Sequence, residues 1–296
     1  MADVAQLAAN ILITGSLYVL MAVGLTMVYR IMRFANFAHA ELITLGAYTA
    51  YSLNQLGFSI YIALPFAFTA SALLAVSLER MVFMPIRDRG GDVISLMIAS
   101  IGAGMVVRHL LQQVYSARVL TYNIPLVSYE LLGARVSQTQ LVIVLLGILS
   151  ILLFHLLLTG TTLGRAMRAT SDNPGLARAS GIPVHRVMLL TWVLGGGIAG
   201  MAGVLRAADT RLVPTLGWEV LLPVFAVVLL GGIGSFYGAV AAAYLLAAAE
   251  NVGVLVLSSL GISTGYRYAI SFVILILVLL FRPHGIAGSR LGGERE

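Results

Sequence analysis

The chain has 296 residues, of which 59% are hydrophobic and only 10% charged, and its mean hydropathy is +0.97. This composition excludes a water-soluble domain. The formal charge of +6 does not indicate nucleic-acid binding, because the basic residues are spread between long apolar runs and form no basic helix face.

Two residue types are missing. All 18 residues counted as lysine or arginine are arginine, and there is no cysteine. Without cysteine there are no disulfides, thiolate metal ligands or cysteine nucleophiles. Without lysine there is no G-x-x-x-x-G-K-[ST] loop, whose lysine reaches the terminal phosphates of ATP, so the chain is not itself such an ATPase. The histidines are scattered and no Ser, His and Asp set is legible, so we expect no metal site, cofactor or enzyme chemistry on this chain.

Apolar runs long enough to cross the hydrocarbon of a bilayer recur along the chain. The first lacks a basic n-region and is too long for a signal-peptide core, so it is interpreted as a span. We predict an all-α, polytopic membrane helical bundle with about eight or nine transmembrane helices, forming one domain over residues 1–296. The second, seventh and ninth spans are the weakest and are candidates for half-spans or re-entrant segments. The predicted spans are 7–28, 40–57, 59–78, 93–114, 139–158, 187–207, 218–233, 236–257 and 266–281.

The arginines predict the orientation. Twelve lie in connections that would share one side of the membrane and three lie in connections on the other. By the positive-inside rule the richer side is cytoplasmic, which places the N-terminus outside and the C-terminus in the cytoplasm. The richer set is Arg30, Arg33, Arg80, Arg87, Arg89, Arg165, Arg168, Arg178, Arg186, Arg282, Arg290 and Arg295, and the poorer set is Arg118, Arg135 and Arg211.

Asn36, His39 and Glu41 form a polar cluster at the start of the second span. Polar groups in a membrane are costly and usually face the bundle interior or a water-filled path. Two interpretations stay open: the cluster holds a turn by capping, which we favour, or it lines the cytoplasmic mouth of a translocation path.

Glu250 lies in a run of alanines deep in the eighth span. Pairing with Arg206 or Arg108 would reduce the cost of burying its charge, so we favour a structural ion pair over a contact with substrate. The two arginines can instead extend to the membrane interface, because each lies within a few residues of a span end.

The basic loop at about 160–186 contains the signals of one short helix. Asn173 can cap its N-terminus, Pro174 suits its first position, Gly181 suits the left-handed residue after its end, and Pro183 prevents continuation. An isolated helix of this length is unstable in water. It must therefore dock, either on its own membrane domain or in a groove of a partner, and the spacing leaves both open.

Glycines are frequent inside the spans, and small residues three or four apart usually serve close helix packing. The run GGIGSFYG differs, because Gly231, Gly232 and Gly234 could also break a helix where a translocation path bends.

Three blocks in order, at 24–48, 163–182 and 229–246, resemble the bacterial ATP-binding-cassette importer permeases for branched-chain amino acids, the LivH type. The blocks read GLTMVYRIMRFANFAHAELITLGAY, LGRAMRATSDNPGLARASGI and LLGGIGSFYGAVAAAYLL. The resemblance covers nearly the whole chain. It implies that the loop helix is the coupling helix, which in such importers sits in a cleft of the ATPase. The residues concerned are Asn173, Pro174, Leu176, Ala177, Arg178, Ser180 and Gly181.

The resemblance also implies a multi-pass subunit of the bacterial plasma (inner) membrane that passes leucine, isoleucine or valine. The implied partners are a second permease of the same family, two cytoplasmic ATP-binding subunits that hold ATP and magnesium, and a periplasmic or lipid-anchored solute-binding protein. Related permeases carry urea, short amides or other amino acids, and no residue here excludes these. A stand-alone secondary transporter or channel is the remoter alternative, since it would more often show inverted repeats with interrupted helices, and no internal repeat is visible.

Overall fold

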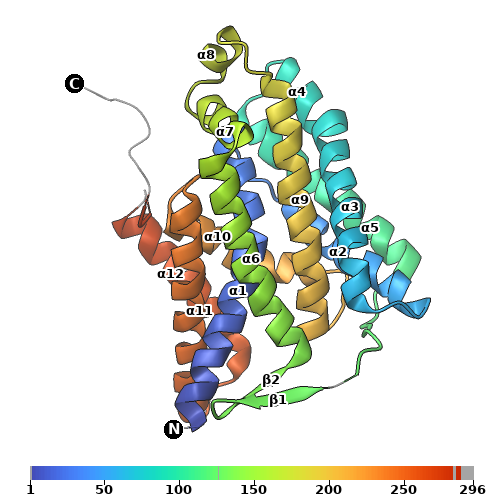
Figure 1. Cartoon of the computed structure of the whole chain (residues 1–296), viewed down its shortest axis with the longest axis vertical. Coiled ribbons are helices and arrows are strands. Elements are labelled where there is room, and N and C mark those ends of the chain that lie inside the picture. The colour runs from blue at the N-terminus through green and yellow to red at the C-terminus, as the bar shows by residue number, and fades with distance from the viewer. Residues whose placement is uncertain (1, 126, 283–284, 288–296) are drawn as a thin grey trace.

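The computed structural model describes residues 2–125, 127–282 and 285–287. It is a helical bundle with a small β-hairpin at one end (Figure 1). Its helices are α1 (Ala2–Met32), α2 (His39–Gln55), α3 (Ile60–Leu78), α4 (Met84–Asp88), α5 (Val93–Tyr115), α6 (Gln138–Gly160), α7 (Thr162–Asp172), α8 (Pro174–Ala179), α9 (Val184–Asp209), α10 (Leu216–Gly231), α11 (Phe236–Ser259) and α12 (Arg267–Phe281). A π-helical turn, Glu79–Phe83, joins α3 to α4, and a 3₁₀ turn, Thr264–Tyr266, precedes α12.

The two ends of the bundle differ. The end that carries α4, α7 and α8 is called the loop-helix end, and the opposite end, with the N-terminus and the hairpin, is called the hairpin end (Figure 1). The hairpin pairs β1 (Ser128–Leu131) with β2 (Ala134–Ser137), and Leu132 and Gly133 turn between them with φ of 52° and 84°. The all-α prediction missed this hairpin, because eight paired residues with a leucine in the turn give a weak strand signal.

Seven helical segments of the described chain are long and apolar enough to cross a membrane. The predicted second and seventh spans are shorter, since α2 has 17 residues and α10 has 16. Each follows an irregular segment, 33–38 before α2 and 210–215 before α10, and each segment and its helix together make one passage through the bundle (Figure 1). Two of the nine predicted spans are therefore only partly helical.

The starts of α2 and α10 meet inside the bundle. The Gly217 amide of α10 donates to the Thr44 hydroxyl of α2 at 3.1 Å, and a Cβ at Gly217 would lie 1.8 Å from the Ala40 carbonyl oxygen. From this joint α2 runs to the hairpin end, where Asn54 bonds the Asn123 carbonyl oxygen, and α10 runs to the loop-helix end. Two short helices thus begin together at mid-depth and point in opposite directions.

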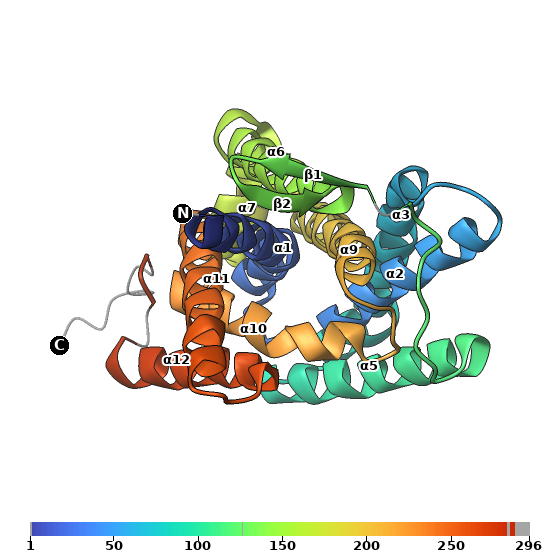
Figure 2. The ribbon, with the colours of Figure 1, turned by 90° about the horizontal axis from the view of Figure 1, so that it is seen from below.

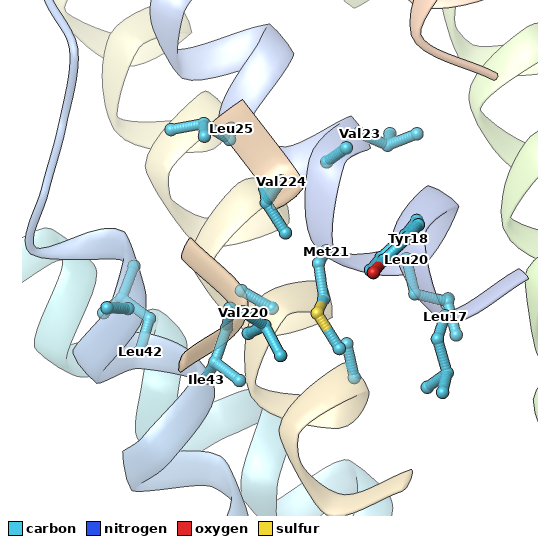
Figure 3. Packing of buried hydrophobic residues seen from close by; sticks show 14 of the residues in the cluster. Leu17, Tyr18, Leu20, Met21, Val23, Leu25, Leu42, Ile43, Val220 and Val224 are labelled. Carbon is cyan, nitrogen blue, oxygen red and sulfur yellow. The ribbon is translucent and has the colours of Figure 1, made fainter. Parts of the chain in front are cut away.

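The core forms around α1. This helix is apolar on all sides, as expected of a helix surrounded by protein, and it packs against α6, α9, α10 and α11 (Figure 2). In its membrane-spanning window 83% of the residues are buried, against 11% for α12. Figure 3 shows Met21 and Leu25 of α1 close to Val220 and Val224 of α10.

Glycines allow the closest contacts, as predicted for the sixth span. A Cβ on Gly24 would lie 2.4 Å from the Gly195 carbonyl oxygen of α9, and one on Gly46 would lie 2.2 Å from that of Gly200. A Cβ on Gly203 would lie 1.8 Å from the Ile43 carbonyl oxygen. Since helices associate in lipid through close packing, these contacts hold α9 against α1 and α2.

The two predicted sets of arginines separate between the ends. Those of the richer set that the structure describes lie at or next to the ends of α1, α4, α7, α8 and α12 or the start of α9, toward the loop-helix end. Arg290 and Arg295 lie outside the described residues. The poorer set lies near the hairpin end, with Arg118 after α5, Arg135 on β2 and Arg211 after α9.

Candidate functional site

The loop helix α8 has the local structure that its sequence predicts. The Asn173 side chain accepts a hydrogen bond from the Leu176 amide at 2.9 Å, and Pro174 occupies the first helical position. Gly181 follows the helix with φ of +80°, and the Ile182 amide donates to the Ala177 carbonyl oxygen at 3.0 Å. These caps fix a six-residue helix with defined ends.

The surface of α8 is almost entirely uncovered by its own chain. Ala177 is its one buried residue, and Leu176 is 65% exposed. Arg178 and Ser180 are also exposed, and Figure 1 shows α8 projecting beyond the other helices. The sequence left two docking sites open for this helix, its own membrane domain or a groove of a partner. The membrane domain covers only Ala177 of α8. The exposed leucine is therefore available to a separate molecule.

Two arginines at the end of α1 bind the turn that carries α8. Arg30 donates to the Ser171 hydroxyl at 3.0 Å, and Arg33 donates to the Ser171 carbonyl oxygen at 2.9 Å. Arg33 has φ of 57°, a conformation uncommon for a side chain larger than glycine. Because Arg33 also begins the irregular segment 33–38, any displacement of the α7–α8 turn acts on the segment that leads to α2.

The irregular segment is partly buried, at Phe34, Asn36 and Ala38, and backbone amides in it bond protein groups. The Asn36 side chain accepts from the Ala38 amide at 3.1 Å and so bonds within the turn before α2, whose N-terminus has no side-chain cap. His39 Nε2 lies 2.9 Å from the Met21 carbonyl oxygen of α1. Asn36 Nδ2 and His39 Nδ1 are buried and have no hydrogen-bond partner among the described residues. Irregular backbone at membrane depth is tolerated where protein encloses it in this way.

Glu41 connects three helices at the joint of α2 and α10. Its Oε1 accepts from Arg108 Nε of α5 at 2.9 Å, and Glu41 is 1% exposed. The Arg108 guanidinium carbon lies 4.8 Å from the ring centre of Trp218 in α10, a cation–π contact. Arg108 therefore does not extend to the interface, and Glu41, Arg108 and Trp218 hold α2, α5 and α10 together.

Glu250 is fully buried, but the prediction of its partner was wrong. It accepts from Arg267 Nε of α12 at 2.9 Å, and neither Arg206 nor Arg108 contacts it. The Tyr18 hydroxyl lies 2.8 Å and 2.7 Å from its two carboxylate oxygens, and Ser271 also bonds it. The α11–α12 hairpin explains this choice, because it returns the chain so that Arg267, at the start of α12, reaches back to Glu250.

The glycines of GGIGSFYG form the tight turn between α10 and α11. Gly232 and Gly234 have φ of +98° and +76°, and a Cβ on Gly231 would lie 2.4 Å from the Gly238 carbonyl carbon. The chain leaves the helical conformation at these glycines, but this is where α10 ends and not a break within a helix. At this turn the Arg30 guanidinium donates a hydrogen bond to the Gly234 carbonyl oxygen at 3.4 Å. The turn accounts for these glycines and lies apart from the buried Asn36, His39 and Glu41.

Several residues that build these clusters carried no legible signal in the sequence. Arg267 falls at the start of the predicted span 266–281 and was given no role, and Tyr18 and Trp218 are aromatic residues among many. Arg267 follows Glu250 by 17 positions, a spacing that places it at the near end of the next helix if the connection between them is short. That spacing is the one signal that could have identified the pair.

The sequence matches the family model described as branched-chain amino acid transport system / permease component over residues 7–279. It is 30% identical to the probable branched-chain amino acid transport permease protein LivH of Methanocaldococcus jannaschii, over 94% of this chain and 90% of that protein. It is 31% identical to the high-affinity branched-chain amino acid transport system permease protein BraD of Pseudomonas aeruginosa, over 96% and 95% of the two chains. Among solved structures, PsaBC from Streptococcus pneumoniae in complex with Fab shares the fold, with a TM-score of 0.53 at 15% identity, over 94% of this chain and 92% of that chain.

Proposed function

Because the chain belongs to the family of branched-chain amino acid transport permeases, we propose that it is the membrane-spanning subunit of an ATP-binding-cassette importer for leucine, isoleucine and valine. The observation that carries the coupling part of this proposal is the exposed helix α8, capped at both ends and covered by its own chain only at Ala177. A helix this short needs a surface to dock on. A groove of an ATP-binding subunit supplies that surface.

In this proposal α8 is the coupling helix. Leu176 enters the partner's groove, and Asn173, Pro174 and Gly181 keep the helix in the shape that fits. Movement of the partner then acts on the α7–α8 turn and, through Arg30 and Arg33, on the segment 33–38. That segment contains the buried Asn36 and leads directly to the buried His39 and Glu41 of α2. These three residues are the candidates for contact with the translocation path.

The loop-helix end is proposed to face the cytoplasm of a bacterial cell from its plasma (inner) membrane. Arginines concentrate at this end, and cytoplasmic connections are rich in basic residues. The N-terminus and the hairpin then lie outside, where a solute-binding protein would deliver the substrate. The C-terminus lies in the cytoplasm.

The remaining parts of the importer are on other chains. A chain without lysine has no phosphate-binding loop, so ATP and magnesium are proposed to bind two cytoplasmic partner subunits. A second permease of the same family completes the membrane part, and a periplasmic or lipid-anchored protein selects the solute. The alternative cargo of such an importer is urea, a short amide or another amino acid.

Changing Leu176 to aspartate is expected to reduce leucine uptake by at least about tenfold, because a central interface side chain contributes about 2 kcal/mol or more and a carboxylate would be buried without a partner. Uptake into proteoliposomes and co-purification of the ATP-binding subunits measure the effect. Leu132→Asp is the matched control: Leu132 is 100% exposed at the opposite end, and its φ of 52° suits aspartate. The Leu132→Asp variant should still co-purify with the ATP-binding subunits. Normal uptake by Leu176→Asp at normal membrane level would contradict the coupling role of α8.

Arg33→Ala is expected to lower the number of leucine molecules transported per ATP hydrolysed, while the importer stays assembled. The variant removes the bonds to Ser171 and Asp172 but leaves α8 unchanged. Parallel assays of uptake and phosphate release measure this ratio. Arg89→Ala is the control, since Arg89 is an exposed arginine at the same end with no side-chain hydrogen bond to the described residues. If Arg33→Ala transports as many leucine molecules per ATP as the unchanged protein, the contact between Arg33 and the α7–α8 turn has no role in coupling.

The proposed function is tested by purifying the tagged chain in detergent with whatever binds it. An importer should bring an ATP-binding subunit and a second permease, and one binding protein loaded with leucine should stimulate ATP hydrolysis. If a binding protein loaded with urea stimulates ATP hydrolysis instead, the chain is still an importer permease but its cargo is urea. Solute transport by the chain alone in liposomes would overturn the proposal in favour of a stand-alone transporter.

A further inference from the structure

A pocket opens near the hairpin end between α1, α9, α10 and α12. Its volume is about 130 Å³. Arg206, Asp209 and Thr210 line it from the end of α9, and Arg267 and Tyr268 line it from α12. It therefore combines an open cavity with several charged groups.

Arg206 and Asp209 lie one helical turn apart but do not pair with each other. Arg206 donates to the Tyr268 hydroxyl at 3.0 Å, and Asp209 accepts from the Gln140 amide at 3.1 Å. Opposite charges at this spacing on a helix usually attract. Within residues 2–125, 127–282 and 285–287, no ion pair occupies either group. One cation and one anion thus remain available side by side.

The second guanidinium of the pocket is already neutralised. Arg267 pairs with the buried Glu250, so it adds no net charge. The free charges of the pocket, from Arg206 and Asp209, sum to zero, which suits a zwitterion better than a simple anion or cation.

Part of the lining is apolar, beside the polar Thr14 and Tyr18 of α1. Leu17 and Met21 of α1 and Val220 of α10 are 3%, 0% and 2% exposed, and Figure 3 shows Met21 and Val220 close together. A ligand held by its charged groups at Arg206 and Asp209 would place a side chain against these three residues. Aliphatic side chains match this lining, because burial of apolar surface is favourable only where the surroundings are also apolar.

We propose that this pocket binds the zwitterionic backbone of a free aliphatic amino acid, with the carboxylate on Arg206 and the ammonium on Asp209. The inference deepens the proposed function and rests on it: the site is the first one on the permease, at the end where a solute-binding protein would release its cargo. The order of steps is delivery, capture by Arg206 and Asp209, and passage inward past Met21 and Val220.

The natural absence of cysteine from this chain makes a direct test possible. Thr210→Cys places a thiol on the exposed rim of the pocket. The assembled importer in nanodiscs is treated with a charged methanethiosulfonate, and labelling of this chain is timed. Leucine at ten times its Kd should slow labelling about tenfold. Neither 3-methylbutylamine, which lacks the carboxylate, nor 4-methylpentanoate, which lacks the amine, should protect at that concentration.

Arg206→Gln should weaken protection by leucine about ten- to hundredfold, as expected from the loss of a charge-assisted bond, and Arg206→Lys should restore part of it. Glu130→Cys, on the exposed strand β1, is the labelling control and should be unaffected by leucine. Monodisperse elution of the assembled importer in size-exclusion chromatography confirms that the Arg206 variants are folded.

The outcomes separate the two proposals. If the importer takes up leucine but leucine does not protect Thr210→Cys, or protection is equal in Arg206→Gln, the pocket assignment is overturned and the importer proposal stands. Equal protection by 3-methylbutylamine and by leucine would also overturn the zwitterion assignment. If leucine protects as described but no uptake occurs with any binding protein, the pocket stands and the importer proposal fails.

Discussion

Gly203→Ala is expected to deplete folded protein from the membrane, although alanine is the better helix former. The new Cβ would lie 1.8 Å from the Ile43 carbonyl oxygen and 2.7 Å from its carbon, both backbone atoms of α2. Either α2 or α9 must move, and overpacking of this kind costs about 3 kcal/mol or more when backbone has to shift. Membrane level and monodispersity in size-exclusion chromatography measure the loss.

Gly102→Ala is the matched control for this prediction. Gly102 is also a helical glycine within a membrane-spanning segment, but a Cβ there would have no neighbour within 4 Å. Alanine should be tolerated or slightly stabilising at this position, since glycine costs a helix about 1 kcal/mol relative to alanine. Equal yields of the two variants would show that the contact between α2 and α9 is looser than described.

Arg267→Met should destabilise the protein by about 3–5 kcal/mol, because it leaves the carboxylate of Glu250 buried without a cation. Glu250 is 0% exposed, so water cannot replace the lost partner. Adding Glu250→Gln should recover most of the loss, since an uncharged amide can still bond Tyr18 and Ser271. Thermal unfolding of the detergent-solubilised protein measures both effects.

The comparison of single and double variants decides the origin of the effect. If Arg267→Met/Glu250→Gln is no more stable than Arg267→Met alone, packing of the arginine side chain, and not its charge, stabilises α12 against α11. Coupling between the two substitutions is expected because their side chains are in direct contact.

The sequence predicted the helices well because a long apolar run has few alternatives in a membrane. The caps of α8 were also legible, since Asn173, Pro174 and Gly181 act through their own local backbone. The irregular segments before α2 and α10 were not located, because their stability comes from distant partners. The Leu212 amide, for example, bonds the Leu120 carbonyl oxygen at 3.0 Å, and the Phe37 amide bonds the Ser100 hydroxyl.

Charge pairing was the least predictable part of the candidate site. Glu250 was correctly expected to need a cation. Three arginines, Arg108, Arg206 and Arg267, lie in other predicted spans and could have supplied it. Which one did so depended on the rotation of α9 and α12 about their axes, and no local signal encodes that rotation. The same uncertainty hid the pairing of Arg108 with Glu41, whose residues are separated by 67 positions.

The meeting of α2 and α10 start to start has an electrostatic consequence. Each helix presents the positive end of its dipole to the joint, and Arg108 adds a guanidinium whose charge Glu41 balances. A proton or sodium ion entering the bundle at this depth therefore meets two like-signed helix ends in a medium of low dielectric constant. Opposed half-helices of this kind raise the barrier to cations in water channels. The field at the joint would therefore oppose the passage of a cation more than that of a neutral solute.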